Sequence, residues 1–216
     1  MGASESDPVD GQLPRHSHRF ADAAAGVRPP DSDLPGRGPP DKSQRALAAA
    51  DLFDRKREEV WIPVDLGPPV SYLIEERASE LSYRLLDLLR AQQLPVLCIT
   101  RQYPERVRRE WGLADVRIIW LSHTPGEDFH KPTAIGALAK VIQKFIEDHG
   151  GEGAVLLDGL EYLVINNGFL QTLMFVEHVS EFVMQKKAIL LLPLSPDTLE
   201  EKELALLERN LVVVRP

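Results

Sequence analysis

From Val70 onward, short apolar runs alternate with segments of helical periodicity, and this alternation constrains the fold more than any other feature of the sequence. Strands that are apolar along their whole length must be buried on both faces, which is typical of parallel sheets covered by helices. The pattern therefore predicts an α/β three-layer sandwich with a mostly parallel sheet of five or six strands. The expected strands are 70–74, 95–100, 117–121, 154–158, 188–192 and 211–214.

Helices are expected between these strands. The first has a predicted apolar stripe of Leu81, Leu85, Leu88 and Leu89, at helical spacing. A charged helix is expected at 104–111, ending at Gly112, and another around 135–146, with Thr133 as its N-cap. Further helices are expected around 169–183 and after Ser195. Ser195 offers a capping hydroxyl, and the next residue is a proline, which is common in the first turn of a helix.

The N-terminal part of the chain has a different composition. Seven of the 17 prolines fall within residues 1–40, among Gly, Ser and Asp, which predicts a disordered tail over residues 1–42. Residues 43–66 are expected to form a helix, over 43–59, and a linker, and residues 67–216 the α/β domain. The tail and helix are candidates for an interaction arm.

Charge and cysteine content limit the functional classes. The net charge of −8 argues against nucleic-acid binding, which usually needs a basic surface. The single cysteine, Cys98, lies in an apolar strand and is predicted to be a buried, structural thiol. The start of the chain does not resemble a signal peptide, and no apolar run is long enough to span a bilayer, so we expect a cytoplasmic location and no membrane partner.

Ligands of such sheets bind beyond the carboxyl ends of the strands. Polar residues follow several predicted strands at these ends: Thr100, Arg101, Ser122, His123, Asp158, Glu161 and Ser195. A strand-end Asp such as Asp158 helps to hold magnesium in phosphate-loop ATPases. Polar residues also follow strands because loops are solvated, and any buried strand can end in Asp, so both interpretations stay open.

A phosphate loop, Gly-x-x-x-x-Gly-Lys-[Ser/Thr], would decide for an ATPase. Its nearest match is Gly36-Arg-Gly-Pro-Pro-Asp41-Lys42-Ser43, which we reject because Asp41 would repel phosphate, prolines lack the N–H donors, and no strand precedes it. After the 70–74 strand, where the loop belongs, the chain has Glu75 and Glu76 and neither glycine nor lysine. ATP hydrolysis by the usual route is therefore not expected.

Residues 71–214 resemble the largely archaeal family called domain of unknown function 835. The resemblance rests on Tyr72-Leu-Ile-Glu-Glu76, Ile99-Thr-Arg101, Trp120-Leu-Ser122, Leu156-Leu-Asp-Gly-Leu-Glu-Tyr-Leu163, Asn166-Asn-Gly-Phe169, Pro196-Asp-Thr-Leu199 and Leu207-Glu-Arg209. Strand order and motif placement also look like the KaiC and RecA ATPase families. The resemblance implies a degenerate, non-hydrolysing relative with a signalling or regulatory role, since family members are frequently joined to sensory modules.

Other chemistry finds little support. The histidines do not match a zinc pattern, although His123 and His130 share one predicted loop with Asp128. Ser122, His123 and Asp158 lack the nucleophile elbow of a hydrolase triad. Arg101 is the arginine best placed for an anion, although the nearby arginines can form a solvated helix face. Residues 161–168 form either a turn or a recognition loop beside the carboxyl ends of the strands.

These observations favour a non-catalytic regulatory or signalling domain that acts by protein–protein interaction or small-ligand sensing. The alternative is a nucleotide-binding protein with weak or atypical hydrolase activity that uses Asp158. We expect no cofactor, no metal, no nucleic acid and no catalytic residue. A protein partner is expected, and self-association stays open. The candidate ligand or partner site is Thr100, Arg101, His123, Asp158, Glu161, Tyr162, Asn166, Asn167 and Ser195.

Overall fold

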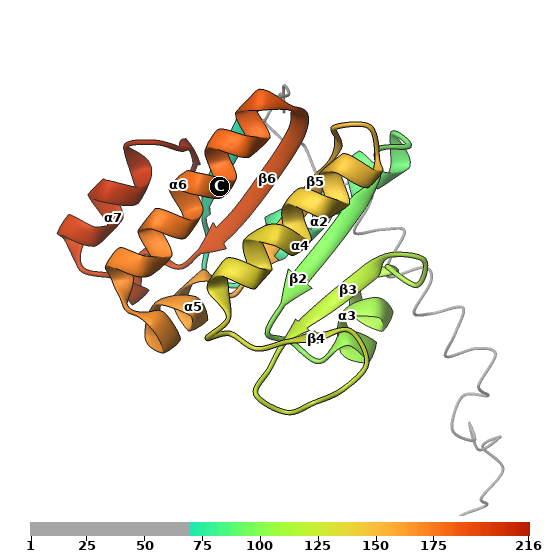
Figure 1. Ribbon diagram of the computed structural model, residues 1–216, viewed down its shortest axis with the longest axis horizontal. Helices are drawn as coiled ribbons and strands as arrows, with labels where there is room; N and C mark the ends of the chain where they lie inside the picture. The colour runs from blue at the N-terminus through green and yellow to red at the C-terminus, as the bar shows by residue number, and fades with distance from the viewer. Residues whose placement is uncertain (1–69) are drawn as a thin grey trace, which may run out of the picture. The chain divides into compact units, whose positions relative to one another are not determined.

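A computed structural model of the protein describes residues 70–216, which form one seven-stranded, wholly parallel sheet in the order β4-β3-β2-β5-β6-β1-β7 (Figure 1). The predicted α/β class is thus confirmed. The strands are β1 (Val70–Glu75), β2 (Val96–Thr100), β3 (Arg117–Leu121), β4 (Phe129–His130), β5 (Glu152–Asp158), β6 (Lys187–Leu194) and β7 (Val212–Val214). The predicted tail 1–42 and the helix and linker 43–66 lie outside the described residues.

Helices cover both faces of the sheet, as the apolar strands require. They are α2 (Glu80–Ala91), α3 (Pro104–Trp111), α4 (Ile135–Asp148), α5 (Leu160–Asn167), α6 (Phe169–Gln185) and α7 (Glu201–Glu208), with a short 3₁₀ turn at Pro196–Thr198. In Figure 1, α4, α6 and α7 lie in front of the sheet, and α2 and α3 lie behind it. No helix within residues 70–216 has the length and apolar character needed to cross a membrane.

The core divides into two layers because successive strand residues point to opposite faces. In β5, Val155 and Leu157 pack in the layer under α4 to α6, whereas Ala154 and Leu156 pack in the layer under α2 and α3. All four side chains are almost completely buried. This two-sided burial explains why the strand reads as an uninterrupted apolar run.

Several sequence predictions need correction. The sheet has seven strands and not five or six, because the two-residue strand β4 carries too little pattern to be recognised. His130 therefore belongs to a strand, with its backbone carbonyl bonded to the Ser122 N–H. Leu88 was expected in the buried stripe of α2 but is exposed, and Leu86 is buried in its place.

Two predicted helix caps are also wrong. Thr133 does not cap α4, whose N-cap residue is Ala134 without a side-chain hydrogen bond. Ser195 begins only the 3₁₀ turn, and α7 starts later, at a capping box formed by Glu200 and Glu203. Hydroxyl residues before a helix pattern are common, so local sequence does not identify which one caps it.

Cys98 is completely buried in β2, as predicted. Burial raises the pKa of its thiol, so the reactive thiolate is scarce at neutral pH. We expect a disulfide reagent such as DTNB to label this single thiol no faster than the protein unfolds, and to label it at once in denaturing guanidinium. Rapid, stoichiometric labelling of the native protein would contradict the burial of Cys98.

Candidate functional site

The carboxyl ends of β2 and β5 bring two predicted site residues together. These strands are neighbours, and their register pairs Thr100 with Asp158 at the last position of each strand. Both side chains are buried, with Asp158 only 7% exposed. A carboxylate so deeply buried needs hydrogen-bond donors to replace water.

Four side chains donate hydrogen bonds to the Asp158 carboxylate. The Ser79 hydroxyl donates to Oδ1 at 2.9 Å, and the Tyr83 hydroxyl to Oδ2 at 2.8 Å. Thr100 Oγ1 and the Gln102 side-chain amide also donate to Oδ2, at 2.9 and 3.1 Å. We call these five residues the Asp158 cluster. Both carboxylate oxygens are thus occupied by the protein itself.

Tyr83 is held for this role from the α2 side of the sheet. Its ring stacks on Trp111 at 4.9 Å between centroids, nearly parallel. Burial, together with the nearby Cys98 and Asp158 acids, raises the pKa of the phenol far above its ordinary value. Tyr83 therefore keeps its proton and remains a hydrogen-bond donor to Asp158.

Ser79 reaches Asp158 from the start of α2, because it adopts an unusual backbone conformation. Its φ is +51°, in the left-handed region that non-glycine residues rarely adopt. Such a conformation is retained where surrounding contacts hold it, and the bond to Asp158 is one such contact. The sequence alone gave no signal for Ser79, Tyr83 or Gln102 as members of the site.

The N-terminus of α2 is occupied by a carboxylate of the same chain. Glu76 accepts hydrogen bonds from the backbone N–H groups of Leu81 and Ser82, at 2.8 and 2.9 Å, and from the Ser82 hydroxyl. Exposed N–H groups at a helix start attract anions, and phosphates bind there in phosphate-loop proteins. Here Glu76 takes that position. Glu75, also expected there, instead forms two hydrogen bonds with Arg215.

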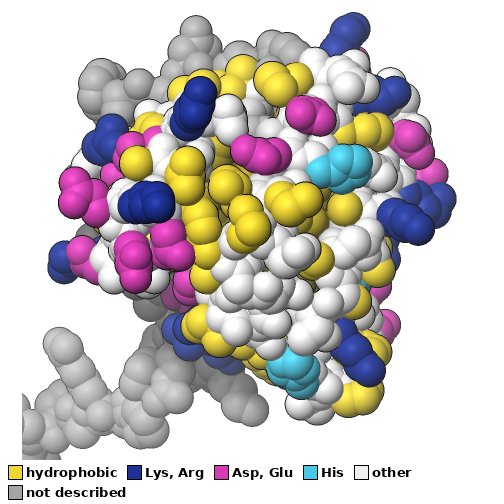
Figure 2. Space-filling model, turned by 60° about the vertical axis from the view of Figure 1, so that its left-hand side comes forward, with side chains coloured by type: hydrophobic (Ala, Val, Ile, Leu, Met, Phe, Trp, Pro, Cys, Tyr) yellow, Lys and Arg dark blue, Asp and Glu magenta, His cyan; other side chains and the backbone are white. Residues whose placement is uncertain are grey.

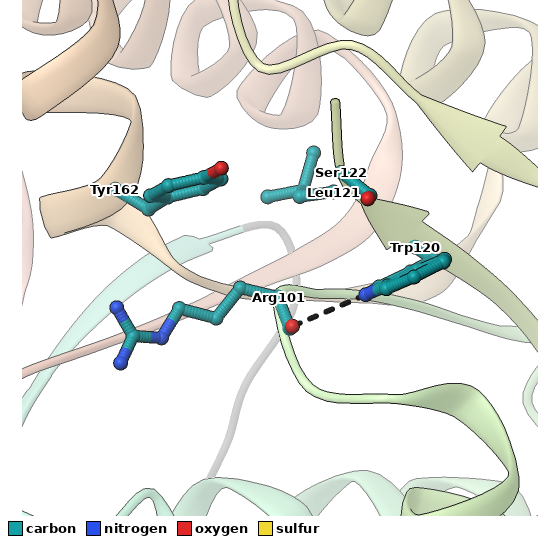
Figure 3. Close-up of a pocket in the computed structure, with 5 residues that line it drawn as sticks. All are labelled: Arg101, Trp120, Leu121, Ser122 and Tyr162. Atoms are coloured by element: carbon teal, nitrogen blue, oxygen red, sulfur yellow. Dashed lines mark hydrogen bonds between the residues drawn. The ribbon is translucent and has the colours of Figure 1, made fainter. Parts of the chain in front are cut away.

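A second group of polar side chains lies at the ends of β2 and β3. The chain turns from β5 into α5 at Gly159, whose φ of +141° suits glycine alone and where a Cβ would lie 3.3 Å from Leu121 Cδ1. This turn places α5 over the strand ends. A pocket of about 350 Å³ results, which we call the rim pocket; its lining residues are Arg101, Trp120, Leu121, Ser122 and Tyr162 (Figure 3).

Other predicted residues contact the lining of the rim pocket or one another. The Arg101 guanidinium lies 3.6 Å from the Glu161 carboxylate, a loose ion pair. Burial raises the pKa of Glu161, and the Arg101 charge partly opposes that shift. His123 Nε2 lies 2.8 Å from Asn166 Oδ1, and its ring meets Tyr162 edge-on.

Residues 161–167 are helical and not a loop, contrary to one interpretation of the sequence. Asn167 has a structural role in this helix, since its side-chain amide donates to the carbonyls of Pro132 and Leu163. Gly168 separates α5 from α6 with φ +81°, as the turn pattern predicted. The short α5 was missed because its apolar residues show little helical periodicity.

The structure thus divides the predicted site. Thr100 and Asp158 belong to one cluster, and Arg101 and Tyr162 line the rim pocket. Glu161 and His123 contact these two lining residues, and Asn166 bonds to His123. Ser195 joins neither group through a side-chain hydrogen bond within residues 70–216. In the same range, no set of three or more His, Cys, Asp or Glu side chains is arranged to hold a metal ion.

Exposed apolar side chains lie on the helices beside the rim. Ile165 on α5 and Leu170 and Met174 on α6 are 77%, 65% and 55% exposed. Figure 2 shows hydrophobic side chains gathered on the face that carries α5, α6 and α7. Exposed apolar side chains that gather on one face are found more often where proteins contact a partner than elsewhere.

Residues 75–211 match the model of a family described as Protein of unknown function (DUF835). The chain belongs to this family. The match begins at the last residue of β1 and ends after α7, so it includes the Asp158 cluster, Glu76 and the rim pocket.

Comparison with curated proteins gave no match. Among solved structures, the chain is similar to a protein from Pyrococcus horikoshii OT3, described as a structural study of Project ID PH0250. The two are 14% identical, and the alignment covers 77% of this chain and 86% of that chain with a TM-score of 0.49.

Proposed function

We propose that this DUF835 member is a non-catalytic domain with a regulatory or signalling role, acting by binding a small ligand or a partner protein. The observation that carries the proposal is Glu76 on the N-terminal amides of α2. An internal carboxylate there both satisfies the N–H donors and repels an incoming phosphate. The exposed apolar side chains of α5 and α6 support the protein-binding part of the proposal.

The proposal treats the domain as a relative of RecA and KaiC that has lost phosphate binding. Phosphate-loop enzymes hold magnesium between a loop Ser or Thr and a strand-end Asp. Here the corresponding groups, Ser79 and Asp158, bond directly to each other. The connection between β1 and α2 is only residues 76–79, too short for a phosphate loop.

The alternative, nucleotide binding through Asp158, would require the chain to break two sets of internal bonds. Glu76 would have to leave the α2 amides, and Asp158 would have to exchange Ser79, Tyr83 and Thr100 for a metal or a ligand hydroxyl. Each buried donor that lost its acceptor would cost about 1–3 kcal/mol. These costs favour the non-catalytic proposal.

Nucleotide binding and turnover test the proposal directly. We expect no rise in melting temperature with millimolar ATP, ADP or GTP and Mg²⁺, because a ligand specific for the native state must stabilise it. We also expect no phosphate release above a buffer blank. Magnesium-dependent ATP turnover that Asp158→Asn abolishes, in a variant whose circular dichroism shows it to be folded, would refute the proposal.

A further inference from the structure

The rim pocket is chemically distinct from the Asp158 cluster, although both lie at the carboxyl edge of the sheet. Its walls come from the ends of β2 and β3 and from α5, whereas the Asp158 cluster depends on the start of α2. The volume of about 350 Å³ falls within the range of small-molecule sites. The pocket is therefore open to a ligand where the Asp158 cluster is not.

Three hydrogen-bond donors at this pocket have no close acceptor within residues 70–216. The Arg101 guanidinium is 3.6 Å from Glu161, beyond hydrogen-bonding distance. The Ser122 hydroxyl accepts from the Thr124 N–H but donates to no group in that range, and the Tyr162 hydroxyl forms no hydrogen bond there. A pocket whose open groups are donors favours a ligand rich in acceptor oxygens.

Flat surfaces bound the same pocket. In Figure 3, the Tyr162 and Trp120 rings lie on opposite sides of the gap, and the Tyr162 hydroxyl is directed toward Leu121 and Ser122. The Arg101 side chain extends below Tyr162, away from the Trp120 ring. The Trp120 indole N–H donates to the Arg101 carbonyl at 3.2 Å, which fixes the ring. Trp120 is further supported edge-on by Tyr103, with 5.7 Å between ring centroids.

We propose that the rim pocket binds a small flat anion, a ring that carries a carboxylate or phosphate group. Its anionic oxygens pair with the Arg101 guanidinium, whose planar fork suits both groups. The ring lies against Trp120 and Tyr162, and other acceptors face the hydroxyls of Ser122 and Tyr162. Binding displaces the loose contact with Glu161. This inference rests on the proposed ligand-binding function and names its ligand class.

The Trp120 indole N–H provides a direct reporter. The chain has three tryptophans, so Trp120→Phe identifies the Trp120 signal in a ¹⁵N-correlated NMR spectrum of the full-length protein. Benzoate and phenyl phosphate serve as charged probes, benzamide as the neutral flat control, and acetate as the ring-free control. We expect a saturable shift of the Trp120 signal with at least one charged probe, with a dissociation constant on the order of 1 mM for a ligand of this size.

Variants separate binding from nonspecific effects. Arg101→Met is expected to weaken the binding of the charged probe about tenfold or more, because the substitution removes the charge-assisted hydrogen bonds. Glu161→Gln is expected to strengthen binding, because it removes the carboxylate that competes for Arg101. Arg117→Met is the matched control, since Arg117 is similarly exposed but lies at the opposite end of β3 and pairs with Asp128. Melting temperatures of all three variants check their folding.

The two charged probes distinguish the sources of the anion: saturation by benzoate alone supports a carboxylate ligand, and saturation by phenyl phosphate alone supports a phosphate ligand. The proposal is overturned if neither probe saturates, if benzamide or acetate binds equally well, or if Arg101→Met binds as well as Arg117→Met. Nucleotide turnover is measured separately. ATP turnover would refute the proposed function. If the probes alone failed to bind, the ligand class proposed here would be refuted and the non-catalytic proposal would stand.

Discussion

Asp158→Ala is expected to lower the free energy of unfolding by about 2 kcal/mol or more. The buried hydroxyls of Tyr83 and Thr100 both lose the carboxylate. Tyr83 can still donate to Thr100 Oγ1 at 3.0 Å, which leaves at least one buried donor unpaired at about 1–3 kcal/mol. The substitution also removes the contact that supports the left-handed backbone of Ser79. Urea denaturation followed by circular dichroism measures the change, read from the midpoint at unchanged slope. If Asp158 were instead a free carboxylate reserved for a metal ion, Asp158→Ala would be expected to leave the free energy of unfolding nearly unchanged.

Two comparison variants sharpen this prediction. Asp158→Asn keeps one acceptor oxygen in place. Its free energy of unfolding should therefore lie between the values of the wild type and of the alanine variant. Asp148→Ala removes a carboxylate of similar size from a surface ion pair with Lys144 and is expected to change stability by less than about 0.5 kcal/mol. If Asp158→Ala were as mild as Asp148→Ala, the Asp158 cluster would not be a structural element.

Glu76→Ala is expected to cost about 2 kcal/mol of unfolding free energy, because losing a side-chain cap costs about 0.5–2 kcal/mol and losing a negative charge at a helix start about 0.3–1 kcal/mol. Glu76→Gln keeps an acceptor oxygen without the charge, so it should retain part of this stability. The same urea titration measures both variants.

Glu105→Ala is the matched control for the Glu76 variants. Glu105 also lies in the first turn of a helix, α3, but its side chain is exposed and pairs with the half-buried side chain of Arg108. Its loss is expected to stay below about 0.5 kcal/mol. Equal stability losses in the Glu76 and Glu105 variants would mean that the Glu76 contacts with the α2 amides contribute little, and the main support for the proposed function would be lost.

These two variants address the same physical question, which is whether the chain has replaced a ligand with its own side chains. Phosphate and magnesium bind other folds through a helix start and a strand-end carboxylate. In this protein Glu76 accepts the hydrogen bonds of the α2 start, and Ser79 donates to the strand-end carboxylate of Asp158. The large stability effects expected here follow from these internal contacts.

Much of the architecture could be predicted from the sequence, because burial on both faces leaves a continuous apolar signature. β5 and β6 were recognised for this reason, and Asp158 was recognised because a carboxylate at the end of such a strand stands out. Arg101 was recognised as a residue that follows a strand, and Tyr162 through the resemblance of residues 156–163 to the family. Both residues line the rim pocket.

What the sequence by itself determined was the α/β class, the boundaries of most strands and the absence of a phosphate loop after β1. Those features depend on local composition and periodicity, which a single chain displays directly. Tertiary structure alone decided which polar groups meet. Ser79 and Tyr83 bond to Asp158 from α2, although α2 follows β1, a strand that is not adjacent to β5. Glu76 faces the α2 amides while Glu75 pairs with Arg215, and Tyr162 of α5 lines one pocket with Trp120 of β3. The physical reason is that parallel sheets bring together strand ends separated by long stretches of chain, and no local pattern records those distances.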